Sequence, residues 1–244
     1  MKGQTDWRLQ TIANFTEEWT SPWAAQTVPK GTQITIVIET KTKLGKTLTL
    51  PLPNATALML NSSQRAYRNA SSLRRNHKID DGKSAQITFR TYPAAFEYLE
   101  SLMEAVLTAH AGLEAFVNDQ IPDDYEYVSH KRSDVILEVS DKSKIERHIS
   151  LSEKISSVLP EILGVKTPKG NSKSWDAYKK LKGLRDRITH MKSEDSKSAG
   201  PDVDTVWHAL VDAEPPHEQA LSVIRYFAKN IENVPRWFKE CPIN

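Results

Sequence analysis

The feature that most constrains the fold is an apolar stripe that follows Pro93. Apolar residues and one histidine recur there at alternating spacings of three and four: Phe96, Leu99, Met103, Val106, His110, Leu113 and Val117. This is the period of an α-helix with one buried face. Pro93 suits the first turn of a helix, where its missing N–H costs nothing. The stripe therefore predicts a long helix buried within one chain or against a second copy.

Further segments after this helix carry helical signals. In "SLSEKISSVLPEILG", Ser150 or Ser152 fits a helix start and Gly164 a helix stop. Another helix is predicted from Trp175 to Met191, because apolar residues line one of its faces. The stretches "VDTVWHALV" and "HEQALSVIRYFAKNIENV" predict two more at the C-terminus. We therefore expect residues 93–244 to form an all-helical bundle.

Residues 1–92 have a different texture. The β-branched runs "TQITIVIETKT", "KTLTLPLP" and "SAQITFRTY" alternate with turn residues, and the first two predict a hairpin around Gly45. The stretch "NATALMLNSSQRAYRNASSLRR" fits a helix for part of its length. We predict an α+β chain with a small β-rich N-terminal region at 1–92 and a helical domain at 93–244. Within that domain, "YEYVSHKRSDVILEVSD" predicts a hairpin insertion.

The composition is that of an ordinary soluble chain. Lysine and arginine number 33 and the acids 31, so a nucleic-acid-binding surface would have to be local. The single cysteine, Cys241, forms no internal disulfide, which favours a reducing cytoplasm. The N-terminus has no apolar signal core, and the longest apolar run, "ITIVI", is too short to cross a bilayer. We expect a cytoplasmic protein.

The segment "LKGLRDRITHMK" carries the strongest candidate chemistry, at Arg185, Asp186 and His190. On a helix Asp186 and His190 share a face, while His190 lies roughly 140° around and about 7.5 Å along from Arg185. The two can flank a groove. Arginine supplies a permanent bidentate cation for phosphate oxygens, and histidine transfers protons near neutral pH. These are the groups needed to cleave RNA without a metal, although on spacing alone a solvated helix face is the more common explanation.

This segment resembles the signature of the HEPN family (higher eukaryotes and prokaryotes nucleotide-binding). Members carry an arginine, a polar residue, three to five further positions and a histidine on the third core helix, and "LRDRITH" fits this order. The stretch "HAGLEAFVND" is similar to the first core helix of many members. The resemblance covers roughly Pro93 to the C-terminus.

The resemblance implies a helical bundle that dimerises and brings two arginine and histidine pairs into one cleft. Many members are cofactor-independent ribonucleases of toxin, antiphage or RNA-processing systems, which leave a 2′,3′-cyclic phosphate. By this resemblance Arg185 would hold the scissile phosphate, His190 would transfer a proton, and Asp186 would orient them. The family often has asparagine where Asp186 stands. Partners would be RNA, a second copy, and a cognate inhibitor or sensor protein; the rival expectation is a non-catalytic member that binds a nucleotide, RNA or a partner protein.

A basic segment precedes the helical domain and predicts contacts to an RNA backbone. Its cations are Arg65, Arg68, Arg74, Arg75 and Lys78. Tyr67 among them could stack on a base. A solvated basic loop is the alternative. A third function class is a basic RNA-binding module without a catalytic site.

Two residues of the long stripe are candidates for support of the site. His110 is expected as a hydrogen-bonded core histidine, or as a member of the cleft if that lies nearby. Glu114 is expected either to support the cleft or to bond helix to helix. Arg187 is expected to be a surface or ion-pairing residue. The remaining histidines show no metal-ligand spacing, so we predict no metal site.

Overall fold

The computed structural model describes residues 6–20, 26–79, 87–128, 139–170, 173–197 and 200–243. It is an α+β structure, dominated by helices, with small two-stranded antiparallel sheets. The chain divides into two compact units. One comprises Met1–Leu58 with Asn233–Asn244, and the other is Met59–Glu232. The α+β class predicted from the sequence is therefore confirmed.

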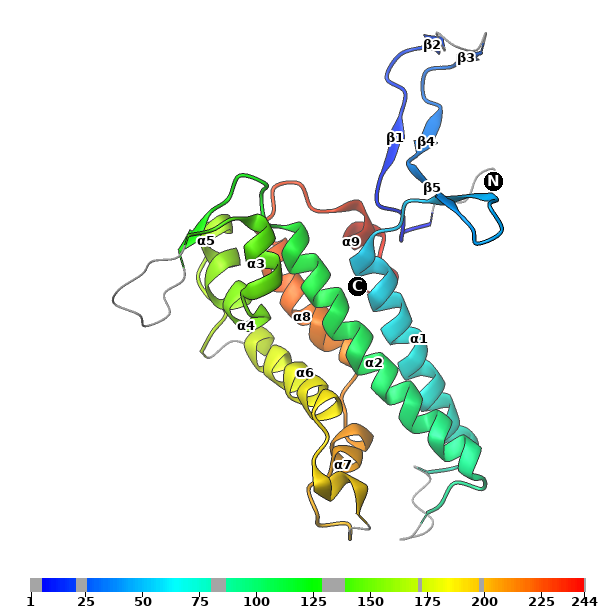
Figure 1. Ribbon diagram of the computed structural model, residues 1–244, viewed down its shortest axis with the longest axis vertical. Coiled ribbons are helices and arrows are strands. Elements are labelled where there is room, and N and C mark those ends of the chain that lie inside the picture. Colours follow the sequence, from blue (N-terminus) through cyan, green and yellow to red (C-terminus); the bar gives the residue numbers. More distant parts are fainter. Residues whose placement is uncertain are drawn as a thin grey trace. The chain divides into compact units, whose positions relative to one another are not determined.

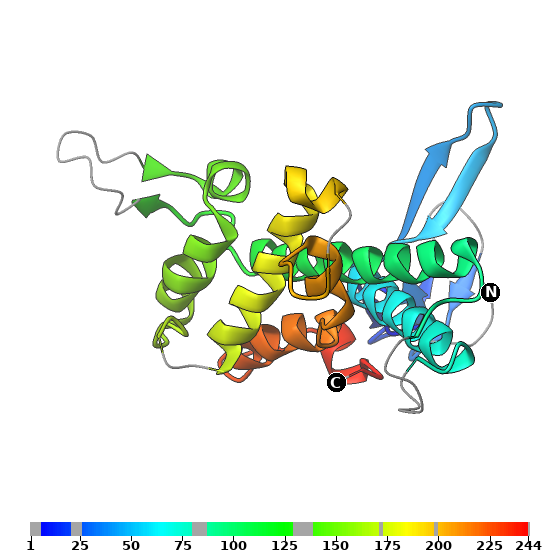
Figure 2. The same ribbon diagram turned by 90° about the horizontal axis from the view of Figure 1, so that it is seen from below.

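The core of the second unit is three helices that contact one another (Figure 1): α2 (Tyr92–Asp119), α6 (Lys173–Thr189) and α8 (Pro216–Ala228). In Figure 2, α6 (yellow) crosses α2 (green) and α8 (orange) lies close to both. The hydroxyl oxygen of Thr91 caps α2 by accepting from the Ala94 N–H. The predicted stripe is buried from Val106 to Val117, whereas Phe96 is 60% exposed.

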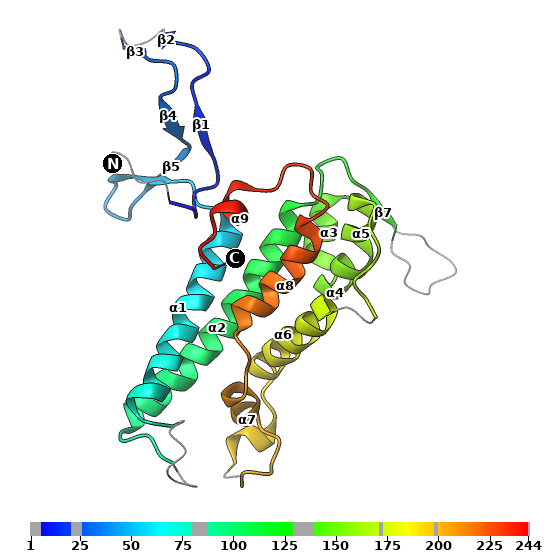
Figure 3. The same cartoon turned by 180° about the vertical axis from the view of Figure 1, so that it is seen from behind.

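Helix α1 (Ala55–Asn76) runs antiparallel beside α2, as Figure 3 shows. The Ser63 hydroxyl donates to the Ala105 carbonyl at 2.7 Å. At Gly112 a Cβ atom would lie 3.1 Å from the Cβ of Met59, so the glycine permits this close approach. The stretch predicted to be helical for part of its length therefore contains a helix of 22 residues, which packs on α2.

The predicted helix after Ser150 is one helical run in three parts: α4 (Leu151–Glu153), the π-helical η1 (Lys154–Val158) and α5 (Leu159–Leu163). The Ser150 hydroxyl caps it and Gly164 ends it at a φ of 60°, so both predicted ends are confirmed. The π-turn was not predicted. Pro160 has no N–H to offer the preceding turn, so the regular ladder is interrupted there.

A small apolar cluster lies beside this run. It joins α3 (Lys142–His148) to the strand pair β7 (Tyr127–Val128) and β8 (Val139–Ser140). Its buried members are Ile121, Tyr127, Ile145, Ile149 and Val158. The β7–β8 pair confirms the base of the predicted hairpin insertion, whose centre lies outside the described residues.

The loop that follows α6 is held by one buried carboxylate. Asp195, in the short 3₁₀ turn η2 (Ser193–Ser196), accepts from the backbone N–H groups of Lys192 and Val206 at 2.7 and 2.8 Å. Arg187 donates to it at 3.1 Å, which confirms Arg187 as an ion-pairing residue. These contacts tie α6 to the start of α7 (Val206–Val211).

The first unit contains three strand pairs, all antiparallel. They are β1 (Ile12–Asn14) with β4 (Gln33–Thr35), β2 (Trp19–Thr20) with β3 (Thr27–Val28), and β5 (Val37–Lys41) with β6 (Thr47–Pro51). Gly45 turns the β5–β6 hairpin at a φ of 76°, as expected. The unit also includes α9 (Arg236–Glu240), where Arg236 donates to the carbonyl of Asp6 at 3.2 Å.

The division between units differs from the predicted boundary at Pro93. It falls within α1, after Leu58, and it places the C-terminal segment with the N-terminal strands. The predicted strand in "SAQITFRTY" lies partly outside the described residues, and Ile87–Thr91 is not a strand. No helix in the described part of the chain has the length and apolarity needed to cross a membrane.

Candidate functional site

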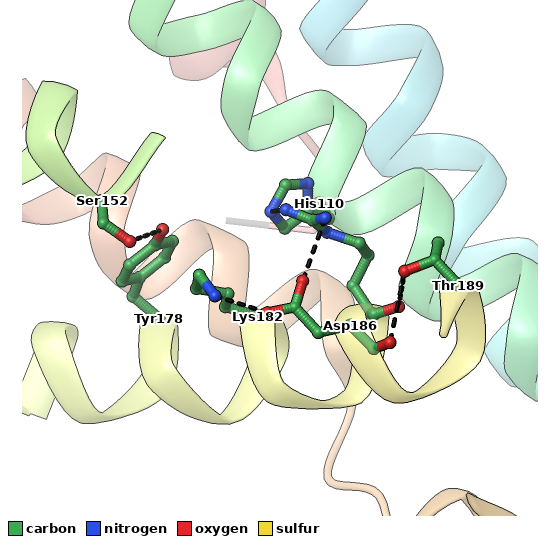
Figure 4. Close-up of polar contacts among 7 residues, drawn as sticks. His110, Ser152, Tyr178, Lys182, Asp186 and Thr189 are labelled. Carbon is green, nitrogen blue, oxygen red and sulfur yellow. Dashed lines mark hydrogen bonds and ion pairs between the residues drawn. The ribbon is translucent and has the colours of Figure 1, made fainter. Parts of the chain in front are cut away.

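Helix α6 presents a row of polar side chains to one cleft. Tyr178, Lys182 and Arg185 are spaced by four and three residues, so they share one face and rise by about 10 Å from first to last. They line a cavity of about 550 Å³ together with side chains of α2 and of the α3–α4 junction. We call this cavity the α2–α6 cleft. Figure 4 shows its polar groups.

Arg185 is held in the cleft by two partners. One guanidinium nitrogen lies 3.1 Å from Nε2 of His110 on α2, and the other lies 3.0 Å from the carboxylate of Asp186. An arginine can only donate, so Nε2 of His110 must be the acceptor and the ring must be neutral. Burial, followed by the charge of Arg185, lowers the pKa of His110 to about 4. His110 is thus a buried, hydrogen-bonded histidine, as expected, and it also lines the α2–α6 cleft.

Asp186 bridges two cations of α6, Lys182 and Arg185. One of its oxygens contacts Arg185 and the other accepts a hydrogen bond from the ammonium of Lys182. Burial works to raise the pKa of Asp186, but the Lys182 hydrogen bond and the charge of Arg185 outweigh it and lower the pKa below its ordinary value. The carboxylate therefore stays charged, and it lies where Lys182 and Arg185 converge.

A pair of hydroxyl groups forms the other end of the row. The hydroxyls of Ser152 and Tyr178 lie 2.7 Å apart, and either can donate (Figure 4). The Tyr178 ring is buried and packs on Trp175, with ring centroids 5.2 Å apart. Burial raises the pKa of Tyr178, so its hydroxyl stays protonated. This end of the cleft offers neutral donors and acceptors.

A buried lysine lies behind the cleft. The ammonium of Lys154 in η1 donates to the side-chain oxygen of Asn118 and to the carbonyl of Glu146, both at 2.8 Å. Its third neighbour is the carboxylate of Glu114, at 3.8 Å. Burial lowers the pKa of Lys154 and Glu114 opposes that effect. Glu114 thus faces the π-turn from α2 and also lines the cleft.

His190 lies apart from these groups. It is the first residue after α6 and is exposed, and it is not among the residues that line the α2–α6 cleft. Its backbone N–H donates to the carbonyl of Asp186 at 2.9 Å. The predicted contact between the Asp186 carboxylate and the imidazole is not among the contacts of the described residues, because that carboxylate faces Lys182 and Arg185. Within one chain, Arg185 and His190 do not meet.

The predicted RNA-binding cations lie along and just after α1. Arg65, Arg68 and Arg75 are exposed on one side of the helix; we call them the α1 arginines. Arg74 faces inward and donates to the Tyr98 hydroxyl and to the Val211 carbonyl. Lys78 is exposed beyond the helix end. Arg74 is therefore a packing contact, and the other four cations are accessible to a ligand.

Sequence reasoning missed three residues of the cleft. Ser152 and Tyr178 belong to different helices and carry no motif, and Lys182 looks like one of many surface lysines. Only the spacing of Lys182 from Arg185 was visible in the sequence, and it could have placed both on one face. Lys154 was missed too, because a fully buried lysine is rare and depends on partners from other helices.

No group of three or more His, Cys, Asp or Glu side chains in the described ranges is arranged to hold a metal ion. Compared with known proteins, the chain matches no family model, no curated sequence and no solved structure. The geometry of the cleft, together with the HEPN-like motif, is therefore the basis for a proposal about function.

Proposed function

We propose that the helical unit is a metal-independent endoribonuclease of the HEPN type. The observation that carries this proposal is the fixed guanidinium of Arg185, which two partners orient at the edge of an open cleft. An oriented cation is what a phosphoryl-transfer site needs, because charge develops on the phosphate oxygens in the transition state. The motif resemblance supplies the reaction type, and a toxin or antiphage role follows from that resemblance alone.

In the proposed reaction the 2′-oxygen of RNA attacks the adjacent phosphorus and the bond to the 5′-oxygen breaks. The products are a 2′,3′-cyclic phosphate and a 5′-hydroxyl. Arg185 neutralises the non-bridging oxygens, and His190 takes the proton of the 2′-hydroxyl or supplies one to the leaving oxygen. Asp186 keeps Arg185 in place through the 3.0 Å contact.

The proposal requires a dimer, because His190 lies outside the cleft that contains Arg185 of its own chain. A second copy would supply the histidine that one chain lacks at this position. The homodimer is therefore part of the proposed function, with RNA as the substrate.

The test is cleavage of total RNA and of tRNA by the purified protein in EDTA, with analysis of the new ends. Wild type should leave 2′,3′-cyclic phosphate, and Arg185→Ala and His190→Ala should each lose at least about 100-fold in rate. The control is His208→Ala, which removes an exposed histidine that pairs with Asp212. Equal cleavage by all four proteins would assign the activity to another site or to a contaminant.

Mixing the two inactive variants tests the shared site. Arg185→Ala retains His190, and His190→Ala retains Arg185, so a heterodimer has one complete pair only if the pair is formed across the interface. We expect mixing to restore at least about a tenth of wild-type activity. No recovery in a mixture that sediments as a dimer would contradict a site shared between chains.

One observation favours a second function, a non-catalytic HEPN-like domain that binds a nucleotide, RNA or a partner protein. The carboxylate of Asp186 forms an ion pair with Arg185. The family often has a neutral asparagine at the position of Asp186. Absence of cleavage together with tight binding of RNA would favour this function over the enzyme.

A further inference from the structure

We infer that Lys182 binds the same phosphate as Arg185, and that the nucleoside next to that phosphate lies in the α2–α6 cleft over the hydroxyls of Ser152 and Tyr178. This inference rests on the proposed function, because it takes the ligand to be an RNA strand. It adds Lys182, Ser152 and Tyr178 to the site. It also places one nucleotide, the one beside the scissile bond, in the cleft.

The first argument is the convergence of two cations on one anionic group. A single carboxylate, that of Asp186, contacts both Lys182 and Arg185. A phosphate also presents several oxygens to its surroundings, so the two cations are already spaced to hold one such group. Asp186 stands where the ligand oxygens would arrive, and a phosphate must share or replace its contacts.

The second argument is the change of chemistry along α6. One turn of helix, about 6 Å, separates Lys182 from Tyr178. Over that distance the lining changes from two cations to two neutral hydroxyls, which can each donate and accept. A nucleotide has the same order of groups, with a charged phosphate followed by a sugar and a base that carry neutral donors and acceptors.

The third argument is the size of the cleft. Its volume of about 550 Å³ lies within the range of small-molecule sites, and one nucleotide fits within it. The cleft is also open to solvent and bounded by exposed Arg147, so a strand can enter and leave it. Sequence-tolerant strand binding needs only such a cation and neutral hydrogen-bonding groups.

The experiment measures binding without cleavage. All variants are made in the His190→Ala background, which removes the proposed proton-transfer group so that binding is measured without cleavage. The probe is a fluorescein-labelled single-stranded RNA of mixed sequence and 12 nucleotides, followed by anisotropy between 50 and 200 mM KCl. Lys182→Met should weaken binding by about 10-fold and reduce the slope of log affinity against log salt by about 1. Thermal unfolding of each variant shows that it is folded.

The matched charge control is Lys179→Met. Lys179 is an exposed lysine of the same helix that pairs with Asp176 and does not line the cleft. It should change affinity by less than about twofold and leave the slope unaltered. Equal effects of Lys179→Met and Lys182→Met would overturn the inference.

The hydroxyl end has its own test. Tyr178→Phe keeps the buried ring and removes one neutral hydrogen bond, so it should weaken binding by about fivefold without changing the salt slope. Tyr92→Phe, at an exposed tyrosine outside the cleft, is the control and should have no effect. Unaltered RNA affinity in both Tyr178→Phe and Ser152→Ala would contradict the placement of the nucleoside.

Free nucleotides distinguish a strand from a small ligand. Adenosine and uridine 5′-monophosphates should displace the RNA probe only at concentrations at least about 100-fold above its Kd, because they lack the contacts outside the cleft. Displacement at concentrations near that Kd would make the cleft a nucleotide site and overturn the strand assignment. Lys182-dependent binding, together with no cleavage by the wild-type protein, would refute the proposed enzyme alone, whereas cleavage by wild type with no effect of Lys182→Met on binding would refute this inference alone.

Discussion

Arg185 and the α1 arginines carry the same charge in opposite settings. Arg185 is half-buried and tied to His110 and Asp186, so its guanidinium has one orientation. The α1 arginines are exposed, and within the described ranges the one ion pair that they form is that of Arg65 with Glu104 at 4.0 Å. A fixed cation stabilises charge at one position, whereas mobile cations attract a polyanion wherever it lies. The cleft is therefore suited to chemistry and α1 to affinity.

The sharpest test of this contrast is a conservative substitution at both places. Arg185→Lys keeps the charge but removes the planar fork, so cleavage should fall by about 100-fold or more. Arg68→Lys should change cleavage and RNA affinity by less than about twofold, because charge alone matters there. Steady-state kinetics on a defined RNA would compare the two. Similar losses at both positions would remove the distinction between fixed and mobile cations.

The second prediction concerns the residue that fixes Arg185. The pKa of His110 is about 4 in the folded protein and about 6.5 when unfolded, so folding favours the neutral ring. The contribution of His110 to the free energy of unfolding therefore has its full value above pH 6.5. It falls by about 3 kcal/mol in total as the pH drops toward 4, because the unfolded chain takes up the proton first. His110→Gln still accepts from Arg185 but does not titrate.

Urea unfolding of wild type and His110→Gln from pH 7 to pH 4 would measure this effect. The free energy of unfolding should fall more steeply for wild type over that interval. Burial also lowers the pKa of His217, but that residue is present in both proteins and its contribution cancels. Parallel pH profiles would mean that His110 is not held neutral beside Arg185.

The third prediction concerns affinity through α1. Replacing Arg65, Arg68 and Arg75 together by glutamine should weaken RNA binding by about 30-fold at 150 mM salt and lower the salt slope by about 2 to 3. The turnover number at saturating RNA should stay within about twofold of wild type. The matched control replaces three exposed lysines away from α1, namely Lys166, Lys169 and Lys229. Equal losses in the two triple variants would indicate a general charge effect and no α1 surface.

The smallest predicted effect is that of Asp186→Asn. Asparagine keeps one oxygen for Arg185 but removes the negative charge that a phosphate must approach, so RNA affinity should rise by about threefold. Asp176→Asn, on the same helix beside Lys179, is the control and should have no effect. Weaker RNA binding by Asp186→Asn would show that the full carboxylate is needed to position Arg185.

The helical elements were predictable because their signals are local. Ser150 begins a helix and Gly164 ends one through groups within a few residues, Pro93 lies in the first turn of α2, and the apolar stripe of α2 follows from its period. The β-rich region of residues 1–92 was predicted less well. Its segment 55–76 is α1, a stretch that the sequence predicted to be helical for part of its length and that packs on α2. The π-turn at Lys154 also depends on distant partners, Asn118 and Glu146.

The sequence by itself determined the α+β class, the main helices and the position of Arg185, Asp186 and His190 near the end of α6. Only the tertiary structure decided that Arg185 meets His110 and that Ser152 meets Tyr178. The physical reason is the range of the interactions. Helix periods and caps act within a few residues, whereas a cleft is formed by side chains that are 26 to 75 residues apart in the chain.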